Sequence, residues 1–384
     1  MKKIGLLTFH ESDNFGTCLQ AFALQHTLKK ISGCQVELLR YYRSNVVRKS
    51  KFNKLQELLR LLFQWNFISI FWIIFGRKKI QRLKKRFREY REKYYSYSAV
   101  TYREYQNFCE HEDDYDAYVV GSDMVWSQDR ATPLSLYFLK FAQTYKKIAY
   151  APSIGSLHIA EDLLPEYKKW LSDFPYISCR EKSGCDLIFD LTGRKVPLVA
   201  DPTLLISAEE WNDIFRLEKS YKAPESTLTL LSYLFDGVPK GSRKTLEDFC
   251  KANHMSQTII PMSPYEHFYS KNELLDPTEF VDLIRKSSLV LTNSYHGLVF
   301  SIIYRKPFCV LARPANAHWV QFEERLTGLL RYLHLENRRI SNISELTTAH
   351  LTLDYSTIEP LLLDFIASST EFLRSSLRDS EGSK

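Results

Sequence analysis

The stretch LVLTNSYHGLVFSII, residues 289 to 303, joins an apolar run typical of a buried strand to a second apolar run typical of a helix. His296 and Gly297 lie at the junction. In an open α/β sheet, ligands bind in the crevice beyond the carboxyl ends of the strands. A helix that begins there offers free N–H groups to an anion. The stretch therefore predicts an α/β fold with an anion site at this turn.

The same alternation of strand and helix runs along most of the chain. Short apolar runs predict strands at residues 3–9, 36–42, 115–123, 146–155, 176–181, 227–235, 257–262, 288–293 and 307–313, and amphipathic segments fall between most of them. Strands separated by helices favour parallel sheets with right-handed crossovers. We expect an N-terminal domain over residues 1–205, a second over 206–350, and a C-terminal helix and tail over 351–384. Ser207 is predicted to cap a helix, with Glu210 as its capping-box partner.

Length and composition indicate a globular protein. The 384 residues are 45% apolar and 14% aromatic, enough for a large core in two domains. The seven cysteines are odd in number and form no C-x-x-C pair, which disfavours a disulfide framework or a zinc site. We expect a reducing, cytoplasmic environment, no signal peptide because HESDN follows MKKIGLLTF directly, and no bound metal.

One segment, about residues 46–98, interrupts the alternation. Residues 61–76 are strongly apolar but too few to span a membrane. Residues 77–93 carry a net charge of +8, which leaves the rest of the chain at −1 because the whole chain carries +7. An apolar helix before a basic one is typical of a segment lying on an anionic membrane surface, here residues 58–93. The alternative is a helical hairpin packed on the protein or on a second subunit of a homo-oligomer. Nucleic acid binding is not expected, because no recognition motif accompanies the charge.

Polar residues follow the predicted strands at their ends. Because the carboxyl ends of parallel strands share one edge of a sheet, we expect these residues to gather at that edge. They are His10, Asp13, Asn14, Ser122, Asp123, Ser153, Arg180, Glu181, Asp201, Asn293, Ser294 and His296.

The order of the motifs that contain these residues resembles the polysaccharide pyruvyl transferase family. The motifs are TFHESDNFGTCLQAFAL, VVGSDMVW, KKIAYAPSIG, ISCREKSGCDLI, VADPTLLISAEEW and LTNSYHGLVFSIIYRKPF, and they cover nearly the whole chain outside residues 46–98. The resemblance implies two Rossmann-like domains arranged like a GT-B glycosyltransferase. It also implies phosphoenolpyruvate as co-substrate, a sugar as acceptor and a pyruvate ketal as product.

This chemistry requires particular groups. The carboxylate and phosphate of phosphoenolpyruvate need guanidinium groups or backbone N–H groups. Protonation of its C3 methylene needs a general acid, and the attacking hydroxyl needs a base. His296 is the candidate acid or phosphate donor, because it stands at a helix start and can titrate near neutrality. The alternative is that it only caps the helix. Asp123 is the candidate base or a binder of the acceptor hydroxyl.

The resemblance places Arg180 against the anionic groups of the donor, with an ion pair to Asp201 as the alternative. Members of the family can carry Arg two residues before the histidine, whereas this chain has Ser294. Either the donor is held by another positive charge, from Arg180, Arg305 or Arg313, or this protein uses a donor other than phosphoenolpyruvate. For Arg305 the favoured interpretation is a stabilising charge at a helix C-terminus.

The remaining candidates have weaker signals. Ser294 and Gly297 are candidates for donor binding, as are Asn14 and Gly16 at the first helix start, where a simple N-cap loop is the alternative. His10 is a candidate for acceptor binding. Trp126 could stack on a sugar, although a buried aromatic residue is the commoner case. Asp201 is expected mainly to shape a turn and cap a helix.

Three functions remain open from the sequence. The first is a cytoplasmic pyruvyl transferase that modifies a surface polysaccharide or its lipid-linked precursor, peripheral to the cell membrane. The second is a GT-B-like glycosyltransferase that uses a nucleotide sugar, which Ser294 leaves open. The third is a carbohydrate-binding or scaffold protein without catalysis, disfavoured because His296 and Arg180 occupy their motif positions.

Overall fold

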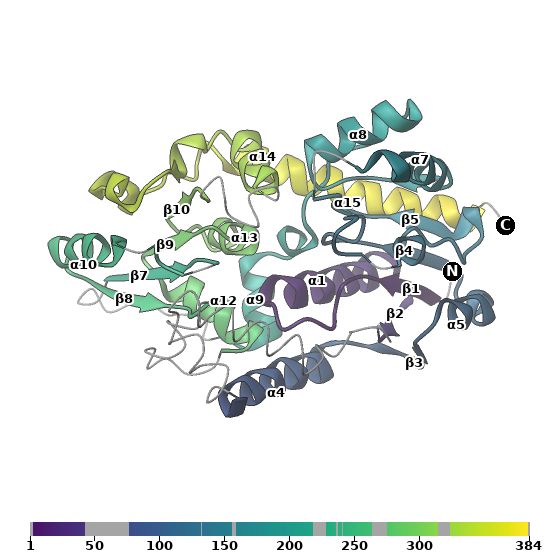
Figure 1. Ribbon diagram of the computed structural model, residues 1–384, viewed down its shortest axis with the longest axis horizontal. Helices are drawn as coiled ribbons and strands as arrows, with labels where there is room; N and C mark the ends of the chain where they lie inside the picture. The colour runs from purple at the N-terminus through teal and green to yellow at the C-terminus, as the bar shows by residue number, and fades with distance from the viewer. Residues whose placement is uncertain are drawn as a thin grey trace.

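The computed structural model describes residues 3–42, 77–131, 133–155, 159–217, 228–235, 237–239, 241–262, 275–313 and 323–382. These residues form two parallel sheets with helices packed around them (Figure 1). The predicted α/β class with parallel sheets is confirmed. The apolar segment at residues 61–76 lies outside the described residues, and the domain boundaries near residues 205 and 350 remain predictions.

The first sheet contains six strands in the order β3-β2-β1-β4-β5-β6. The strands are β1 (Lys3–Leu7), β2 (Gln35–Tyr41), β3 (Tyr97–Tyr102), β4 (Ala117–Val120), β5 (Lys147–Ala149) and β6 (Tyr176–Ile177). Every pairing is parallel, and β1 lies between β2 and β4. This is the strand order of a Rossmann fold, in which the direction of winding reverses between β1 and β4.

The second sheet contains five parallel strands in the order β11-β10-β9-β7-β8. The strands are β7 (Leu228–Tyr233), β8 (Met255–Ile259), β9 (Leu289–Thr292), β10 (Phe308–Leu311) and β11 (Arg339–Ile340). In chain order this is the doubly wound 2-1-3-4-5 arrangement, which reverses between β7 and β9. Each sheet therefore has one switch point where a ligand crevice is expected.

The helices pack around both sheets. In the N-terminal half they are α1 (Phe15–Ser32), α4 (Arg77–Tyr94), α5 (Tyr105–Glu110), α6 (Leu134–Tyr137), α7 (Leu164–Ser172) and α8 (Lys182–Thr192). They continue with α9 (Ala208–Phe215), α10 (Ser242–Ala252), α12 (Pro277–Lys286), α13 (Tyr295–Ile303), α14 (Glu324–Tyr332) and α15 (Glu359–Gly382). A short 3₁₀ helix, η4 (Pro202–Leu205), precedes α9.

Local sequence explains where the helices begin and end. The side chain of Asn14 accepts a hydrogen bond from Thr17 N at 3.1 Å and caps α1, and Gly33 ends α1 with a left-handed φ of 67°. Ser207 caps α9 as predicted, accepting from Glu210 N at 3.2 Å. The predicted capping box does not form in full, because the Glu210 carboxylate instead accepts from Lys30 Nζ and lies 2.8 Å from His26 Nε2 on α1.

Helix α1 joins the two halves through a shared core. It packs against both α12 and α13 of the second sheet's layer. The ring of Phe15 stacks on that of Phe280, with centroids 4.8 Å apart and planes 5° apart. Such an aromatic pair contributes about 1 kcal/mol beyond the area it buries. The first turn of α1 is thereby fixed against the C-terminal half.

Helix α15 runs back from the C-terminal half along the N-terminal half (Figure 1). It contacts α1 and η4. The hydroxyl of Ser369 accepts a hydrogen bond from the backbone N of Ala200 at 2.8 Å, and the ring of Phe372 lies 6.3 Å from that of Tyr150. The chain therefore passes between the two halves twice.

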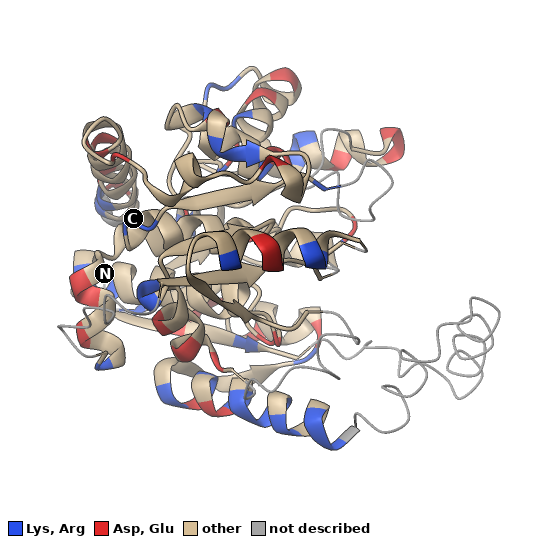
Figure 2. Cartoon of the chain, turned by 90° about the vertical axis from the view of Figure 1, so that its left-hand side faces the viewer, with Lys and Arg blue, Asp and Glu red and all other residues tan. Residues whose placement is uncertain are grey.

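Helix α4 is part of the packed structure, not a detached arm. Phe87 and Tyr90 are buried, and Arg86 bonds to Asp276 at 3.1 Å and to Glu279 at 2.7 Å on α12. Its outer face carries the exposed basic residues that Figure 2 shows along the helix. For α4, the predicted packing on the body of the protein is confirmed. None of the helices in the described part of the chain has the length and apolar character needed to cross a membrane.

Candidate functional site

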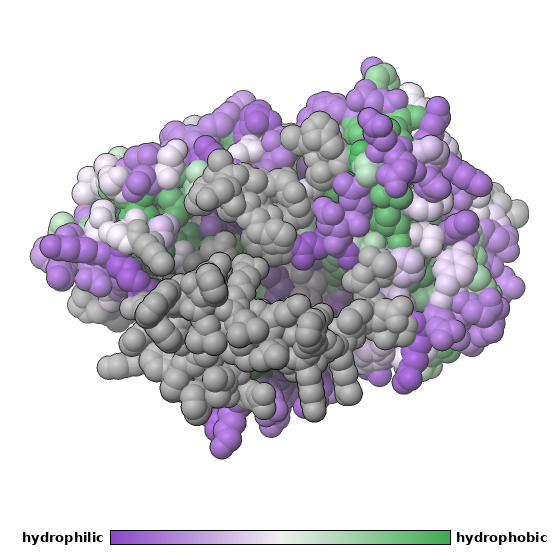
Figure 3. Space-filling model, in the orientation of Figure 1, coloured by the Kyte–Doolittle hydropathy of each residue, from purple (hydrophilic) through white to green (hydrophobic). Residues whose placement is uncertain are grey.

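The site is a cavity between the carboxyl edges of the two sheets. Its volume is about 730 Å³. Figure 3 shows hydrophilic residues in the hollow between the two halves. The lining comes from the loops after β1 and β4 on one side and after β7 and β9 on the other, which are the two switch points. Predicted site residues that line it are His10, Asn14, Asp123, Ser294 and His296.

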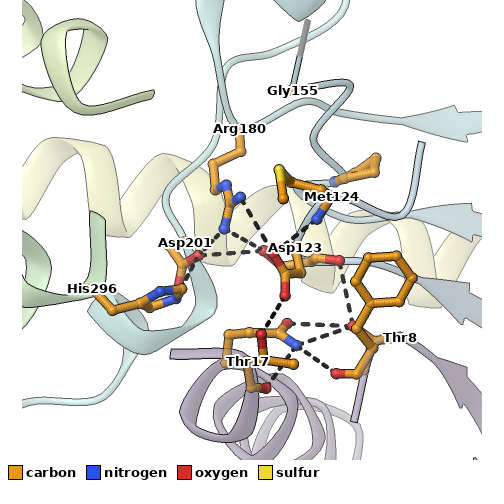
Figure 4. A network of polar contacts seen from close by, with 12 residues as sticks. Thr8, Thr17, Asp123, Met124, Gly155, Arg180, Asp201 and His296 are labelled. Atoms are coloured by element: carbon orange, nitrogen blue, oxygen red, sulfur yellow. Dashed lines mark hydrogen bonds and ion pairs between the residues drawn. The ribbon is translucent and has the colours of Figure 1, made fainter. Parts of the chain in front are cut away.

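Asp123 follows β4 and faces the cavity with its oxygens already engaged. Its Oδ2 accepts from the hydroxyl of Thr17 at 2.9 Å, and its Oδ1 accepts from the backbone N of Met124 at 2.9 Å (Figure 4). The residue has a φ of 60°, in the left-handed region that a non-glycine residue seldom adopts. Contacts to α1 and to its own loop therefore hold the carboxylate in place.

Behind the cavity wall lies a buried ion pair between Arg180 and Asp201. Arg180 Nη1 is 2.5 Å from Asp201 Oδ2, and both side chains are buried. The other oxygen, Asp201 Oδ1, accepts from the backbone N of Thr203 at 3.0 Å and from its hydroxyl at 2.7 Å, which caps η4 as expected. Of the two interpretations of Arg180, the ion pair is the one that the structure shows.

The charges of the pair sustain each other. Burial alone would raise the pKa of Asp201, but His296 when it is protonated, the charge of Arg180 and the bonds from Thr203 lower it. Burial alone would lower the pKa of Arg180, but the carboxylates of Asp201 and Asp123 raise it. A buried ion pair with satisfied hydrogen bonds is stable where a lone buried charge is not. Both groups are therefore charged at neutral pH.

His296 lies in the first turn of α13, beside this pair. Its Nε2 is 3.7 Å from Asp201 Oδ2, and the residue is 7% exposed. Burial lowers the pKa of His296, Asp201 raises it and Arg180 lowers it further. The imidazole is therefore neutral at neutral pH in the absence of an anionic ligand. A bound dianion would favour its protonated form, because an adjacent negative charge raises the pKa of a histidine.

The predicted glycines permit close approaches at this site. A Cβ on Gly16 would lie 2.0 Å from Nδ1 of His296, so the imidazole rests directly on the backbone of α1. A Cβ on Gly297 would lie 2.3 Å from the hydroxyl oxygen of Thr292. Ser294 caps α13, accepting from Gly297 N at 3.4 Å. Gly16 thus lets the imidazole of His296 pack on the start of α1, and Gly297 lets the start of α13 pack against the end of β9.

In the described part of the chain, three arginines line the cavity: Arg130, Arg313 and Arg325. Arg313 donates to the backbone oxygen of Asn293 at 2.8 Å, and the Arg325 guanidinium lies 5.9 Å from the centre of the Tyr295 ring. Burial, followed by the charge of Arg180, lowers the pKa of Arg325 to about 10, so it remains charged at neutral pH. Among these, only Arg313 was a candidate from the sequence. Arg130 and Arg325 have no sequence signal that sets them apart from solvated arginines.

Two further candidates lie away from the cavity. Trp126 is fully buried, donates through Nε1 to the backbone oxygen of Tyr137 at 3.0 Å, and stacks on Phe138 with ring centres 5.0 Å apart. Stacking of Trp126 on a sugar is therefore wrong, because no face of its ring is available. Arg305 lies outside the cavity lining, where it forms a two-point ion pair with Glu359 near the end of α13.

His10 follows β1 and is 3% exposed. Its Nδ1 lies 2.9 Å from the backbone oxygen of Thr8, and its Nε2 lies 3.9 Å from Glu11 Oε1. The ring lines the cavity on the side of the first sheet, across from Ser294 and Arg313. Within the described residues, no cluster of three or more His, Cys, Asp or Glu side chains is arranged to hold a metal ion.

Comparison with known structures confirms the fold. A candidate UDP-N-acetylglucosamine 2-epimerase from Listeria monocytogenes superposes with a TM-score of 0.50 at 11% identity, covering 98% of this chain and 91% of that one. UDP-GlcNAc 2-epimerase from Neisseria meningitidis gives a TM-score of 0.48 at 10% identity, covering 98% and 99%. MurG from Acinetobacter baumannii gives a TM-score of 0.39 at 9% identity, and the match covers 97% of this chain and 95% of that one. The architecture is GT-B-like, with two Rossmann-like sheets facing a shared cleft.

Comparison by sequence gives the family. None of the curated proteins compared with the chain matches it. The model of the polysaccharide pyruvyl transferase family matches residues 14–314, which is more than half of the chain and includes the turns after β4 and β9. The chain therefore belongs to the polysaccharide pyruvyl transferase family.

Proposed function

We propose that this protein transfers pyruvate from phosphoenolpyruvate to two hydroxyl groups of a sugar, forming a pyruvate ketal and releasing phosphate. The family supports a pyruvyl donor and a sugar acceptor in general terms. The observation that carries the proposal is the concentration of positive charge in the cavity. Burial is the largest cause of the lowered pKa of Arg325, and the positive charges of Arg180 and, more weakly, Arg313 lower this pKa further.

An anion with several charges would relieve this repulsion. Arg130, Arg313 and Arg325 line one cavity, and among the lining residues that the structure describes only Glu11 and Asp123 are acidic. Asp123 is bonded to Thr17 and lies 4.0 Å from Arg180. Guanidinium groups bind carboxylate and phosphate through paired N–H groups. The cavity arginines therefore take the place of the arginine that family members can carry at the position of Ser294.

His296 is the proposed general acid. When the donor binds, its phosphate and carboxylate favour the imidazolium form, which can then protonate the C3 methylene carbon. C2 becomes electrophilic and accepts a sugar oxygen. Asp201 stands behind the imidazole at 3.7 Å and stabilises the charged form, while Arg180 keeps Asp201 ionised. Arg180 thus acts through Asp201 in this proposal, and the arginines of the cavity contact the donor.

We also propose that the acceptor is carried on a lipid at the inner face of the cell membrane. The support is the outer face of α4, where Lys78, Arg82, Lys84, Lys85, Arg88 and Lys93 are exposed. Glu89 and Glu92 pair with Lys85 and Arg88, which leaves a net positive face. Because Phe87 and Tyr90 are buried in the protein, α4 would contact the membrane through charge and not by insertion.

The test is to incubate the purified protein with phosphoenolpyruvate and a panel of free and lipid-linked sugars, and to measure phosphate release and ketal formation. We expect release that depends on the acceptor and is lost in His296→Ala. Arg325→Ala should also reduce release, because Arg325 is proposed to contact the donor. Arg331→Ala is its matched control, because Arg331 lies on the outer face of α14, is 60% exposed and pairs with Glu324. Turnover with a nucleotide sugar and none with phosphoenolpyruvate would overturn the proposal.

A further inference from the structure

The acceptor hydroxyl needs a base, and the described residues place a second histidine in the cavity. His10 and His296 come from opposite halves of the protein and line the same cavity. The imidazole of His10 is 3% exposed. Its Nε2 is a buried polar atom with no hydrogen-bond partner in the described part of the chain. A buried polar atom without a partner is costly, so its retention in a ligand cavity calls for an explanation.

The hydrogen bond at the other nitrogen fixes the form of the ring. A carbonyl oxygen can only accept, so the 2.9 Å contact between Nδ1 and the backbone oxygen of Thr8 requires the proton on Nδ1. In the neutral imidazole, Nε2 then carries the lone pair. Burial lowers the pKa of His10, which keeps this neutral form at neutral pH. His10 therefore offers a lone pair held in a fixed orientation.

Asp123, the candidate base from the sequence, is less suited to this role. Each of its oxygens already accepts a hydrogen bond, from Thr17 and from the backbone of Met124. Its Oδ1 also lies 4.0 Å from Arg180 Nη2. Both oxygens of Asp123 are thereby occupied by donors of the protein itself. Asp123 is better placed to bind a hydroxyl than to deprotonate one.

We infer that His10 is the general base that deprotonates the attacking sugar hydroxyl, with Nε2 as the accepting atom. This inference rests on the proposed function and divides the proton transfers between two histidines. In the first addition, the hydroxyl proton passes to His10 while the His296 imidazolium protonates C3, and the sugar oxygen bonds to C2.

The second half of the reaction restores both side chains. The C2–O bond to phosphate breaks, and the departing phosphate takes the proton held by His10. The second hydroxyl bonds to C2 and gives its proton to His296. The two sugar hydroxyls give up two protons in total. One proton ends on C3 and the other on phosphate, so atoms and charge balance. No additional reactant is needed.

The charged groups around His10 come from four segments. Glu11 lies beside Nε2 and raises the pKa of His10, whereas Arg91 on α4 and Arg40 on β2 lower it. Tyr97 on β3 has its ring 5.7 Å from the imidazole and donates to Glu11 at 3.2 Å. The burial of the ring is the largest influence and lowers the pKa. We therefore expect the rate to fall at acidic pH, where His10 becomes protonated.

The decisive variant is His10→Asn in the full-length protein. The asparagine amide can still donate to Thr8, because its nitrogen takes the place of Nδ1, but nothing replaces Nε2. We expect kcat to fall about 100-fold or more, the range for loss of a general base. Binding of phosphoenolpyruvate without acceptor, measured by calorimetry, should stay within threefold. The acidic limb of kcat/KM against pH should disappear.

Two further variants make the result decisive. His26→Asn is the matched control, since His26 lies on the outer part of α1 with Nε2 2.8 Å from Glu210, and all three measurements should match the wild type. Should His10→Asn fold poorly by circular dichroism, His10→Ala with added imidazole replaces it. Recovery of the rate by imidazole supports the inference, and a folded variant that imidazole leaves inactive overturns it.

Asp123→Asn decides between the two bases. If the acidic limb survives in His10→Asn and disappears in Asp123→Asn, the inference is overturned. If the wild type turns over a nucleotide sugar instead of phosphoenolpyruvate, the proposed function has failed but not the inference. A sugar hydroxyl still needs a base in that reaction, and the same comparison is then made with that donor.

Discussion

Replacing Gly16 with alanine tests the packing of His296 directly. The added Cβ would lie 2.0 Å from Nδ1, 2.4 Å from Cγ and 2.7 Å from Cε1 of the imidazole. Nonbonded atoms at an optimal separation are about 3.5 Å apart. The ring or the start of α1 must therefore move by about 1.5 Å. Since Phe15 is stacked on Phe280, we expect the imidazole to move more readily than the helix.

The effect on stability follows from two opposing contributions. Overpacking of this kind costs about 1 to 3 kcal/mol. Alanine in place of glycine in a helix gains up to about 1 kcal/mol. We expect a net loss of about 1 to 2 kcal/mol, which corresponds to a fall in Tm of roughly 2 to 8 °C for a domain of this size. Thermal unfolding followed by circular dichroism measures it.

The effect on activity should exceed the effect on stability. A misplacement of about 1 Å in a catalytic group can reduce the rate about 100-fold. Moving the imidazole also changes its 3.7 Å separation from Asp201. We expect phosphate release to fall about 100-fold at a temperature where Gly16→Ala is fully folded. Binding of phosphoenolpyruvate should change less than the rate.

Gly328 in α14 provides the matched control. A Cβ there would meet only Glu324 Oε1, at 3.9 Å, which is an ordinary contact. Gly328→Ala should therefore raise Tm through helix propensity alone and leave the rate unchanged. If Gly16→Ala were as stable as Gly328→Ala and turned over at the wild-type rate, the argument that Gly16 makes room for His296 would be refuted.

Three other perturbations test the charges. In steady-state kinetics, Arg325→Met should raise KM for phosphoenolpyruvate about tenfold or more, because a hydrogen bond to a charged group contributes roughly 1.5 to 3 kcal/mol. An unchanged KM would contradict donor binding by Arg325. The free energy of unfolding, measured in urea, should fall as pH drops below 6.5, because the unfolded chain takes up protons on His10 and His296 that the folded protein resists. In the double variant His10→Asn/His296→Asn, this free energy should depend less steeply on pH. Replacing Arg82 and Lys84 with glutamate should abolish salt-sensitive sedimentation of the protein with phosphatidylglycerol vesicles, because each cation contributes about 1 kcal/mol to membrane binding. If the variant bound the vesicles as well as the wild type, α4 would be excluded as the contact.

The fold was predictable because its information is local. Apolar runs and helical periodicity marked the strands and helices, and cap residues such as Ser207 marked where helices begin. Strand β3 was missed, because YSAVTY alternates polar and apolar residues beside the basic segment and was partly assigned to the insertion. Strand β11 has only two residues and gives no periodic pattern.

The candidate site was predictable where a residue follows a strand. His10, Asp123 and His296 each lie just beyond the carboxyl end of a strand, and the topology brings them to one cavity. Arg325 was not predictable, because a basic residue on an amphipathic helix looks the same whether it faces solvent or a ligand. The burial of Trp126 also depends on partners distant in the chain, among them Phe174.

The return of α15 to the N-terminal half limits how the cleft can move. The chain passes between the halves once before β7 and again through α15, so the two halves are connected at two places. Sliding or wide separation would break the contact between Ser369 and Ala200. A widely opened cleft would therefore lose this buried hydrogen bond and the packing of α15 on α1.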